Sequence, residues 1–337
     1  HILAISGLHV GIIAFISFFI ARLVMKSSEY LLLRFNIFTV SALCSVIPVI
    51  GYTFIAGLRI STIRATMMIL CYLFALLMGR ERNLFNILAF AAFLILIISP
   101  VSLFDISFQL SFTAVAAILL VTPALSGMIP KPEGGGIFRR GITAIILFIL
   151  VSLAAVIGTA PLIAFYFNRL STITLVANLF AIPIIGFAVL PVGILLLVAA
   201  PFPPASSILI TIASFFIRIA LSIIKALASL PFTSIPVATP TLLEIVFYYL
   251  CVFAVVRLLN TWRSGGTEAP SGSFPSVIER LTRWYRTREK SLLGLVLVLI
   301  TFFFVTDAFL TNLRATGRRY LEVTFIDVGQ GSSTLLE

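Results

Sequence analysis

Residues 142–167 read ITAIILFILVSLAAVIGTAPLIAFYF, a run without one Asp, Glu, Lys or Arg. A helix of about 20 apolar residues crosses the ~30 Å hydrocarbon core of a bilayer, so this run is long enough to span a membrane. The rest of the sequence has the same character, because 61% of the 337 residues are hydrophobic and only 10% are charged. A soluble domain has about 25% charged residues. The composition therefore predicts an all-α polytopic membrane protein and excludes an ordinary soluble domain.

Similar apolar runs on both sides of this segment predict a bundle of about ten transmembrane helices. The run at 84–99 is short for a span, and the run at 173–200 contains Pro183 and Gly186, which kink or break a helix. Broken helices in membrane proteins often line cavities. The predicted spans are residues 2–24, 35–57, 61–78, 84–99, 106–125, 142–167, 173–200, 206–230, 241–260 and 291–310.

Lysine and arginine residues orient this bundle, because they are enriched in short cytoplasmic loops. They follow the first, third, fifth and ninth predicted spans. We therefore expect a multi-pass protein of the cytoplasmic membrane, with the segment after residue 310 on the extracytoplasmic side. Residues 277–290 show a basic amphipathic pattern, which suits a helix lying on the anionic lipids of the inner leaflet. The formal net charge of +11 follows largely from this topology and does not by itself indicate DNA binding.

Three arginines break the charge pattern, because they fall on the predicted outer side. Arg59 and Arg64 belong to the turn GLRISTIR at 57–64, and Arg169 follows the span at 142–167. As a group they indicate an anion-binding mouth, since the guanidinium contacts phosphate with two parallel hydrogen bonds and stays charged. The alternative is that each arginine reaches lipid headgroups or caps a helix C-terminus.

The first eleven residues, HILAISGLHVG, place polar groups at the head of an apolar run. Ser6 and His9 are three residues apart on one helix face, the arrangement that a serine-histidine dyad for intramembrane proteolysis would need. The two histidines are too far apart on a helix to share a metal ion. A structural role, with His9 hydrogen-bonded inside the bundle, is the interpretation favoured here. Gly7 and Gly11 form a G-x-x-x-G face that permits close helix contact.

A second polar constellation lies in residues 99–112, which read SPVSLFDISFQLSF. Asp105 is placed to cap the helix that follows it, and Gln109 is a candidate site residue one turn later. Further along the chain, Asn178 stands in an apolar context and is predicted to lie in the bundle interior.

Several ordered segments together carry a family resemblance: residues 3–11, 57–65, 99–112, 159–171 and 176–183, with Asn86. They resemble the competence membrane domain of the ComEC family. That resemblance implies a channel that imports single-stranded DNA across the cytoplasmic membrane during natural transformation, with membrane lipids around it, a DNA receptor outside and an ATP-driven helicase inside. The residues expected at the DNA entrance or along its path are Arg59, Arg64, Arg169, Gln109 and Asn178. Those expected to shape the pore are Ser6, Gly7, His9 and Gly11.

The C-terminal residues 321–336 alternate like a strand and then turn at Gly329 and Gly331. They resemble the first strand of the metallo-β-lactamase-like domain that follows this membrane domain in the family, although Ser332 stands where relatives commonly have an acidic residue. The metal ligands of such a domain would lie beyond Glu337, so we expect no catalytic centre and no cofactor in this chain. The implied domains are the channel at 1–260, a linker with the basic helix at 261–290, a last span at 291–310 and the start of the extracytoplasmic domain at 311–337.

A transporter is the alternative function that the sequence leaves open. The bundle could carry a small anionic solute or a lipid precursor, with a site near the membrane midplane at the irregular helix around Pro183. DNA passage requires a continuous polar path, whereas a transporter requires an occluded pocket.

Overall fold

The computed structural model describes residues 7–27, 29–34, 36–80, 83–129, 137–230, 233–263, 323–327 and 332–336, and the single residues 294, 298 and 301. The chain divides into two compact units, His1–Thr241 and Leu242–Glu337. The predicted basic helix at 277–290 lies outside the described residues, and so does the predicted span at 291–310 apart from the three single positions.

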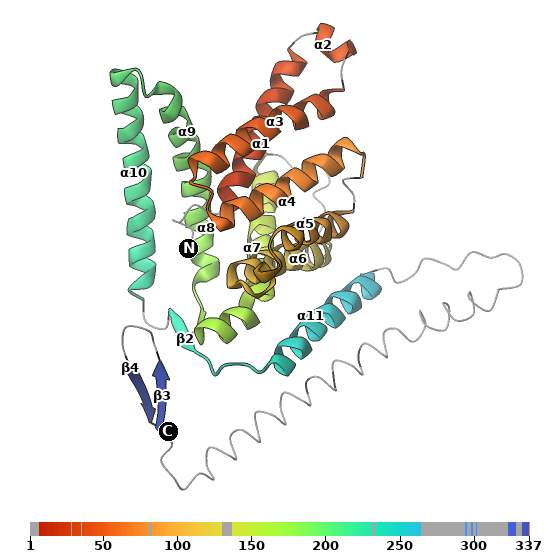
Figure 1. Cartoon of the computed structure of the whole chain (residues 1–337), viewed down its shortest axis with the longest axis vertical. Coiled ribbons are helices and arrows are strands. Elements are labelled where there is room, and N and C mark those ends of the chain that lie inside the picture. The colour runs from red at the N-terminus through yellow and green to blue at the C-terminus, as the bar shows by residue number, and fades with distance from the viewer. Residues whose placement is uncertain are drawn as a thin grey trace, which may run out of the picture. The chain divides into compact units, whose positions relative to one another are not determined.

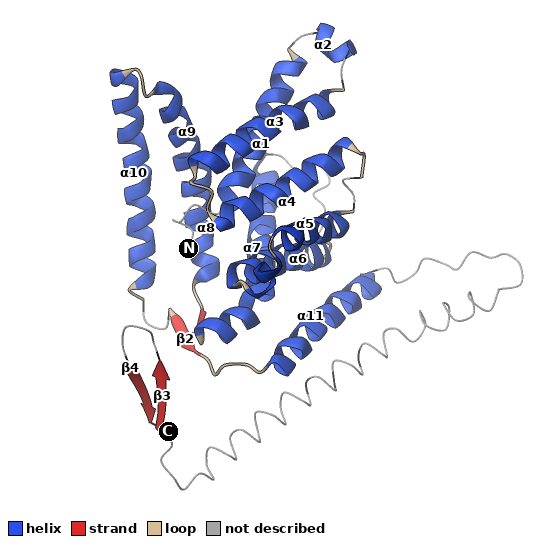
Figure 2. Cartoon of the chain, viewed as in Figure 1, coloured by secondary structure: helices blue, strands red, loops and turns tan. Residues whose placement is uncertain are grey.

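Helices make up most of the described chain, as Figures 1 and 2 show. Eight helical stretches in the described part are long and apolar enough to cross a membrane, and the shorter α5 is also apolar. The all-α polytopic fold is thus confirmed, with spans that begin and end within a few residues of the predicted ones. The elements are α1 (Gly7–Lys26), α2 (Glu29–Arg34), α3 (Ile37–Ile55), α4 (Ile60–Leu77), α5 (Leu84–Ile98), a 3₁₀ turn η1 (Pro100–Phe104), α6 (Ile106–Ser126), α7 (Ile137–Phe167), α8 (Thr174–Ile182), a π-helical segment η2 (Pro183–Val189), α9 (Leu190–Ala199), α10 (Pro203–Ala228) and α11 (Leu242–Arg263).

The interior of the first unit is built from small side chains, and large apolar side chains face outward. Ala42, Ser41 and Ser45 are fully buried between helices, whereas Leu33 and Phe138 are among the most exposed residues. A soluble protein would show the opposite distribution. Small residues let helix backbones approach closely when the surrounding lipid is as apolar as leucine. The distribution therefore fits a protein surrounded by lipid.

Two glycines bring helices into close contact. A Cβ atom on Gly7 would lie 2.9 Å from the Cβ of Ala65, so α1 packs tightly on α4 there, as the G-x-x-x-G pattern predicts. The prediction is wrong for Gly11, which has no atom within 4 Å of an added Cβ because that side of α1 is open at this level. Between α6 and α7, a Cβ on Gly158 would overlap the Cβ of Ala117 and lie 2.9 Å from the carbonyl oxygen of Thr113.

Replacing Gly158 by alanine should destabilise the bundle by about 1–3 kcal/mol, the usual cost of overpacking a tight interface. The backbone carbonyl of Thr113 cannot move aside as a flexible side chain could. Gly141→Ala is the matched control, because Gly141 lies in the same helix and has no atom within 4 Å of an added Cβ. Thermal unfolding in detergent should show a lower Tm for Gly158→Ala only. Equal Tm values for the two variants would contradict the close packing of α6 on α7.

The irregular span predicted at 173–200 keeps its helical course. Pro183 and Gly186 lie in η2, and the backbone remains in the right-handed helical region at Ile182 before it and at Leu190 after it. The predicted irregularity is confirmed as a π-helical segment, which accommodates the missing amide hydrogen of proline without a break. An added Cβ on Gly186 would lie 2.7 Å from Ile12 Cδ1, so α1 packs against this segment.

Two short antiparallel sheets complete the described structure. Strand β1 (Arg169–Ser171), directly after α7, pairs with β2 (Ser234–Pro236), an arrangement that the sequence does not predict. Strand β3 (Val323–Asp327) pairs with β4 (Ser332–Leu336), so the predicted C-terminal strand is confirmed as part of a hairpin. Residues 328–331 between them lie outside the described part of the chain.

Candidate functional site

The turn between α3 and α4 positions two of the candidate arginines, Arg59 and Arg64. Gly57 follows Ala56, the C-cap of α3, with a φ of 77°, and Leu58 comes next with a φ of 51°, a left-handed conformation that costs a non-glycine residue about 1–2 kcal/mol. The amide of Leu58 donates to the carbonyl of Thr53 and closes this turn. Arg59 then has an extended backbone and precedes the first turn of α4, where its side chain is exposed.

Arg64 lies in α4 and is almost completely buried, with 3% of its surface exposed. None of its three side-chain nitrogens has a hydrogen-bond partner among the described residues. The paired carboxylate is Asp105, whose Oδ2 lies 3.9 Å from Arg64 Nη1, beyond hydrogen-bond length. A buried guanidinium in a membrane span is costly and marks a candidate functional site.

Asp105 is fixed in place because it begins α6. One of its carboxylate oxygens, Oδ1, accepts a hydrogen bond of 2.6 Å from the amide of Ser107, which confirms the predicted N-cap. The other oxygen, Oδ2, lies on the side of Arg64. The same side chain therefore starts a helix and, among the described residues, supplies the negative charge paired with the buried arginine.

A pocket of about 340 Å³ opens beside this pair. Its polar lining comes from Arg64, Ser99, Ser102 and Asp105, contributed by α4 and by the segment between α5 and α6. The rest of the wall is aliphatic or thioether in character. Those side chains are Ile60, Ile63, Met67, Ile95, Ile98 and Val101. The pocket is thus amphipathic, with a charged end and apolar walls.

Gln109 connects three elements through its side-chain amide. Its Nε2 donates to the carbonyl of Leu103 in η1 at 3.0 Å, and its Oε1 accepts from the hydroxyl of Tyr166 in α7 at 2.8 Å. Asn178 in α8 donates to Ser152 Oγ in α7 at 3.1 Å, and its half-buried side chain fits the predicted interior position. Both amides act as links between helices, and their place along a DNA path stays a prediction.

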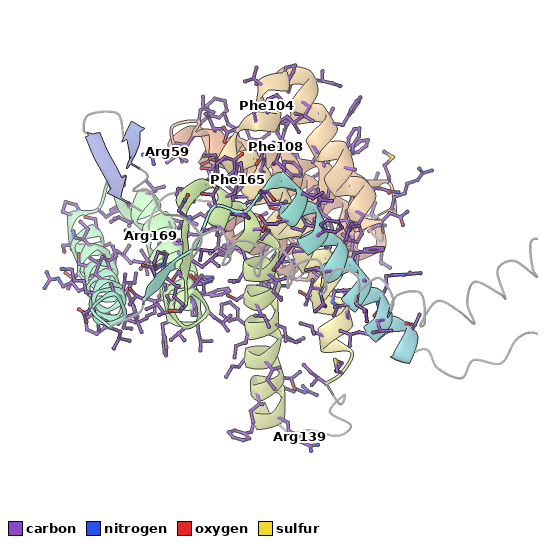
Figure 3. The ribbon with its side chains drawn as sticks, turned by 90° about the horizontal axis from the view of Figure 1, so that it is seen from below. Arg59, Phe104, Phe108, Arg139, Phe165 and Arg169 are labelled. Atoms are coloured by element: carbon purple, nitrogen blue, oxygen red, sulfur yellow. The ribbon has the colours of Figure 1, made fainter. Side chains whose placement is uncertain are left out.

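The three candidate arginines do not share one exposed surface. Arg59 and Arg169 are exposed, whereas Arg64 is buried, because the helical turn between residues 60 and 64 places that side chain toward α5 and α6. The place of all three at the DNA entrance or along its path stays a prediction. Figure 3 shows Arg59 and Arg169 toward the end of α7 that carries Phe165, while Arg139 lies at the opposite end. The enrichment of basic residues in cytoplasmic loops predicts the same separation, with Arg59 and Arg169 on the outer side and Arg139 on the cytoplasmic side.

The N-terminal candidates are only partly placed. His9 is buried in α1, as expected for a histidine in the bundle interior, and Gly7 lies at the contact with α4. Ser6 lies outside the described residues, so the structure does not test the dyad with His9, the alternative that the sequence does not favour. Pairing Arg64 with Asp105 was the step that sequence reasoning missed. The signal was available, since both are charged residues in apolar surroundings on the same predicted side of the membrane.

The fold and the buried arginine define a polytopic helical membrane protein with a polar site inside its apolar bundle. The chain belongs to the competence protein family, whose model matches residues 1–262. That range contains α1 to α10 and all but the last residue of α11.

Three relatives illustrate this similarity. ComE operon protein 3 of Bacillus subtilis is 29% identical over 203 residues, 58% of this chain and 23% of the relative. Recombination protein 2 of Haemophilus influenzae is 28% identical over 195 residues, 57% of this chain and 24% of the relative. An uncharacterized protein of Aquifex aeolicus is 31% identical over 206 residues, 61% of this chain and 42% of the relative. The aligned region is therefore less than half of each relative, and no solved structure matches the chain.

Proposed function

We propose that this protein takes part in DNA uptake during competence, as a channel that imports single-stranded DNA across the cytoplasmic membrane. The observation that carries the proposal is the family match over residues 1–262, which covers nearly all of the described helices. Its similarity to ComE operon protein 3 and Recombination protein 2 supports the same role. A bundle with polar groups buried inside it suits passage of a charged polymer better than a purely structural role.

Arg59 and Arg169 are proposed to form the positively charged entrance on the extracytoplasmic side. Both are exposed, and both lie toward the same end of α7 in Figure 3. Positive side chains at a channel mouth raise the local concentration of DNA through phosphate attraction, without reading the bases. Arg64 is buried and is not part of this surface.

The remaining parts of the proposal concern the whole protein. The C-terminal hairpin β3–β4 would begin an extracytoplasmic metallo-β-lactamase-like domain, and hydrolysis would be carried out in that domain. A DNA receptor outside and an ATP-driven helicase inside are the proposed partners. A secondary transporter of a small anionic solute or a lipid precursor is the other candidate function, favoured by the pocket beside Arg64.

A deletion strain complemented with the full-length gene tests this function and its entrance together. Deletion should abolish import of labelled DNA, and the Arg59→Gln/Arg169→Gln variant should lower it about tenfold, the lower end of what electrostatic steering contributes. The deficit should shrink as salt is raised, since exposed charges are screened. Import is measured as nuclease-protected label inside the cell.

Arg139→Gln is the matched control, because Arg139 lies at the opposite end of α7 in Figure 3. It should import DNA normally at equal protein level in the membrane. Normal import by the entrance variant would exclude the proposed entrance. Persistence of import in the deletion strain would overturn the function and favour the transporter.

A further inference from the structure

The buried guanidinium of Arg64 requires hydrogen-bond acceptors that the described residues do not supply. An arginine side chain has five N–H donors, and none of the three nitrogens of Arg64 is hydrogen-bonded within the described structure. The carboxylate of Asp105 approaches to 3.9 Å and is itself used as a helix cap. A ligand oxygen in the adjacent pocket would meet this requirement.

The shape and chemistry of the pocket favour an amphipathic ligand. A volume of about 340 Å³ is far larger than a single inorganic anion needs, and most of the lining is aliphatic. The described lining contains no aromatic side chain, whereas sites for single-stranded nucleic acid combine positive charge with aromatic platforms on which bases stack. The pocket therefore suits a lipid better than a DNA strand.

The position of the pocket agrees with a lipid headgroup. Helix α5 has 15 residues, or about 22 Å of helix at 1.5 Å per residue. That length is less than the ~30 Å hydrocarbon core of a bilayer. The turn η1 follows where α5 stops, and Ile98 and Val101 at this edge of the pocket are 74% and 75% exposed. Acyl chains would contact this apolar edge while the headgroup enters toward Arg64.

The charges of the pocket indicate which headgroup fits. Arg64 and Asp105 contribute one positive and one negative charge. A purely anionic headgroup would satisfy the arginine but would face the carboxylate. A headgroup with a phosphate and a primary ammonium two carbons apart meets both charges at once, and the ammonium donates hydrogen bonds that a quaternary ammonium lacks.

We infer that the pocket between α4, α5 and η1 binds the phosphoethanolamine headgroup of a membrane phospholipid, with its phosphate on Arg64 and its ammonium on Asp105. The hydroxyls of Ser99 and Ser102 lie in the same lining and offer further contacts to the phosphate. This lipid site lies beside the proposed DNA entrance, since Ile60 of its wall directly follows Arg59, but it does not depend on DNA uptake.

Native mass spectrometry of the full-length protein in detergent tests this site. The probes are phosphatidylethanolamine, phosphatidylcholine and phosphatidylglycerol with identical acyl chains, soluble phosphoethanolamine, and an oligothymidylate. Phosphatidylethanolamine should bind at least about tenfold more tightly than phosphatidylcholine, the effect of losing one charge-assisted hydrogen bond. Equal affinities for all three lipids would overturn the proposal. Binding of oligothymidylate in competition with lipid would also overturn it and assign the pocket to nucleic acid.

Variants locate the binding in the pocket. Arg64→Met should weaken all three lipids, and Asp105→Asn, which keeps a capping side chain, should remove only the preference for ethanolamine. Val101→Trp narrows the pocket from its exposed edge without changing either charge and should weaken binding about tenfold or more. Arg140→Gln, at the far end of α7, serves as the control. If the lipid affinity is unchanged in both single variants, Val101→Trp and Arg64→Met, this pocket is excluded as the lipid site.

Discussion

Replacing Asp105 by alanine is expected to lower the free energy of unfolding by about 2–4 kcal/mol, because two contributions disappear together. The N-cap of α6 is lost, since Asp105 Oδ1 accepts from the amide of Ser107. The buried Arg64 also loses its nearest counter-charge. Breaking a buried ion pair costs about 3–5 kcal/mol, and the partial exposure of Asp105 reduces that contribution, so the expected total lies toward the lower end of this range or just below it. Unfolding in mixed detergent micelles measures the change.

Two further variants separate the cap from the charge. Asp105→Asn keeps a side chain that caps well and removes the charge, so it reports the loss for Arg64 alone. Asn36→Ala removes the cap of α3, where Asn36 accepts from the amides of Phe38 and Thr39 with no ion pair involved. That control should cost about 1 kcal/mol. A cost for Asp105→Ala no larger than this control would show that the ion pair contributes nothing.

The double variant Arg64→Met/Asp105→Asn extends the same test. It removes both charges and leaves an apolar side chain in an apolar wall, a change that often restores or raises stability. We expect the double variant to be more stable than Asp105→Asn alone. If the loss of stability in the double variant equals the sum of the losses in Arg64→Met and Asp105→Asn, Arg64 stabilises the fold through contacts other than its charge.

The spans were predictable from the sequence because nothing but a helix satisfies the backbone of a long apolar run in lipid. The face that each helix turns toward the protein interior was not predictable from the sequence. In α4, Thr62, Arg64 and Thr66 are buried while Ile60 and Ile63 are exposed, the reverse of a soluble amphipathic helix. Lipid is as apolar as isoleucine, so the hydrophobic pattern alone cannot indicate which side faces the protein.

The contacts between distant segments were equally hidden. Asp105 could be assigned as a cap from its local sequence, but its approach to Arg64 depends on how α4 packs beside the start of α6. The pairing of β1 with β2 involves three residues on each side, too few for a period-two pattern to be recognised. Local chemistry was predictable at these positions, and the long-range pairing was not.

Replacing Gln109 by leucine should lower the free energy of unfolding by about 1–3 kcal/mol, because two hydrogen bonds are lost and one of the two partners, Tyr166, is partly buried. The carbonyl of Leu103 loses its donor and the hydroxyl of Tyr166 loses its acceptor, while leucine keeps a similar volume. Tyr166→Phe breaks only the second bond and should cost about 1–2 kcal/mol. A double-mutant cycle on the unfolding free energies in detergent gives the coupling between the two side chains.

Comparing DNA import with the unfolding free energies of the same variants decides whether Gln109 acts as a link between helices or as a group on the DNA path. Tyr30→Phe is the matched control, because Tyr30 accepts from Arg34 on the surface of one short helix, and the change should stay within about 0.5 kcal/mol. If Gln109 is a structural link, DNA import should fall in Gln109→Leu and in Tyr166→Phe in proportion to their loss of stability. Loss of import in Gln109→Leu at unchanged stability would instead place its amide in contact with the DNA. The hydrogen bonds to η1 and α7 favour the structural link, since they already use one of the two amide N–H groups and one lone pair of the amide oxygen.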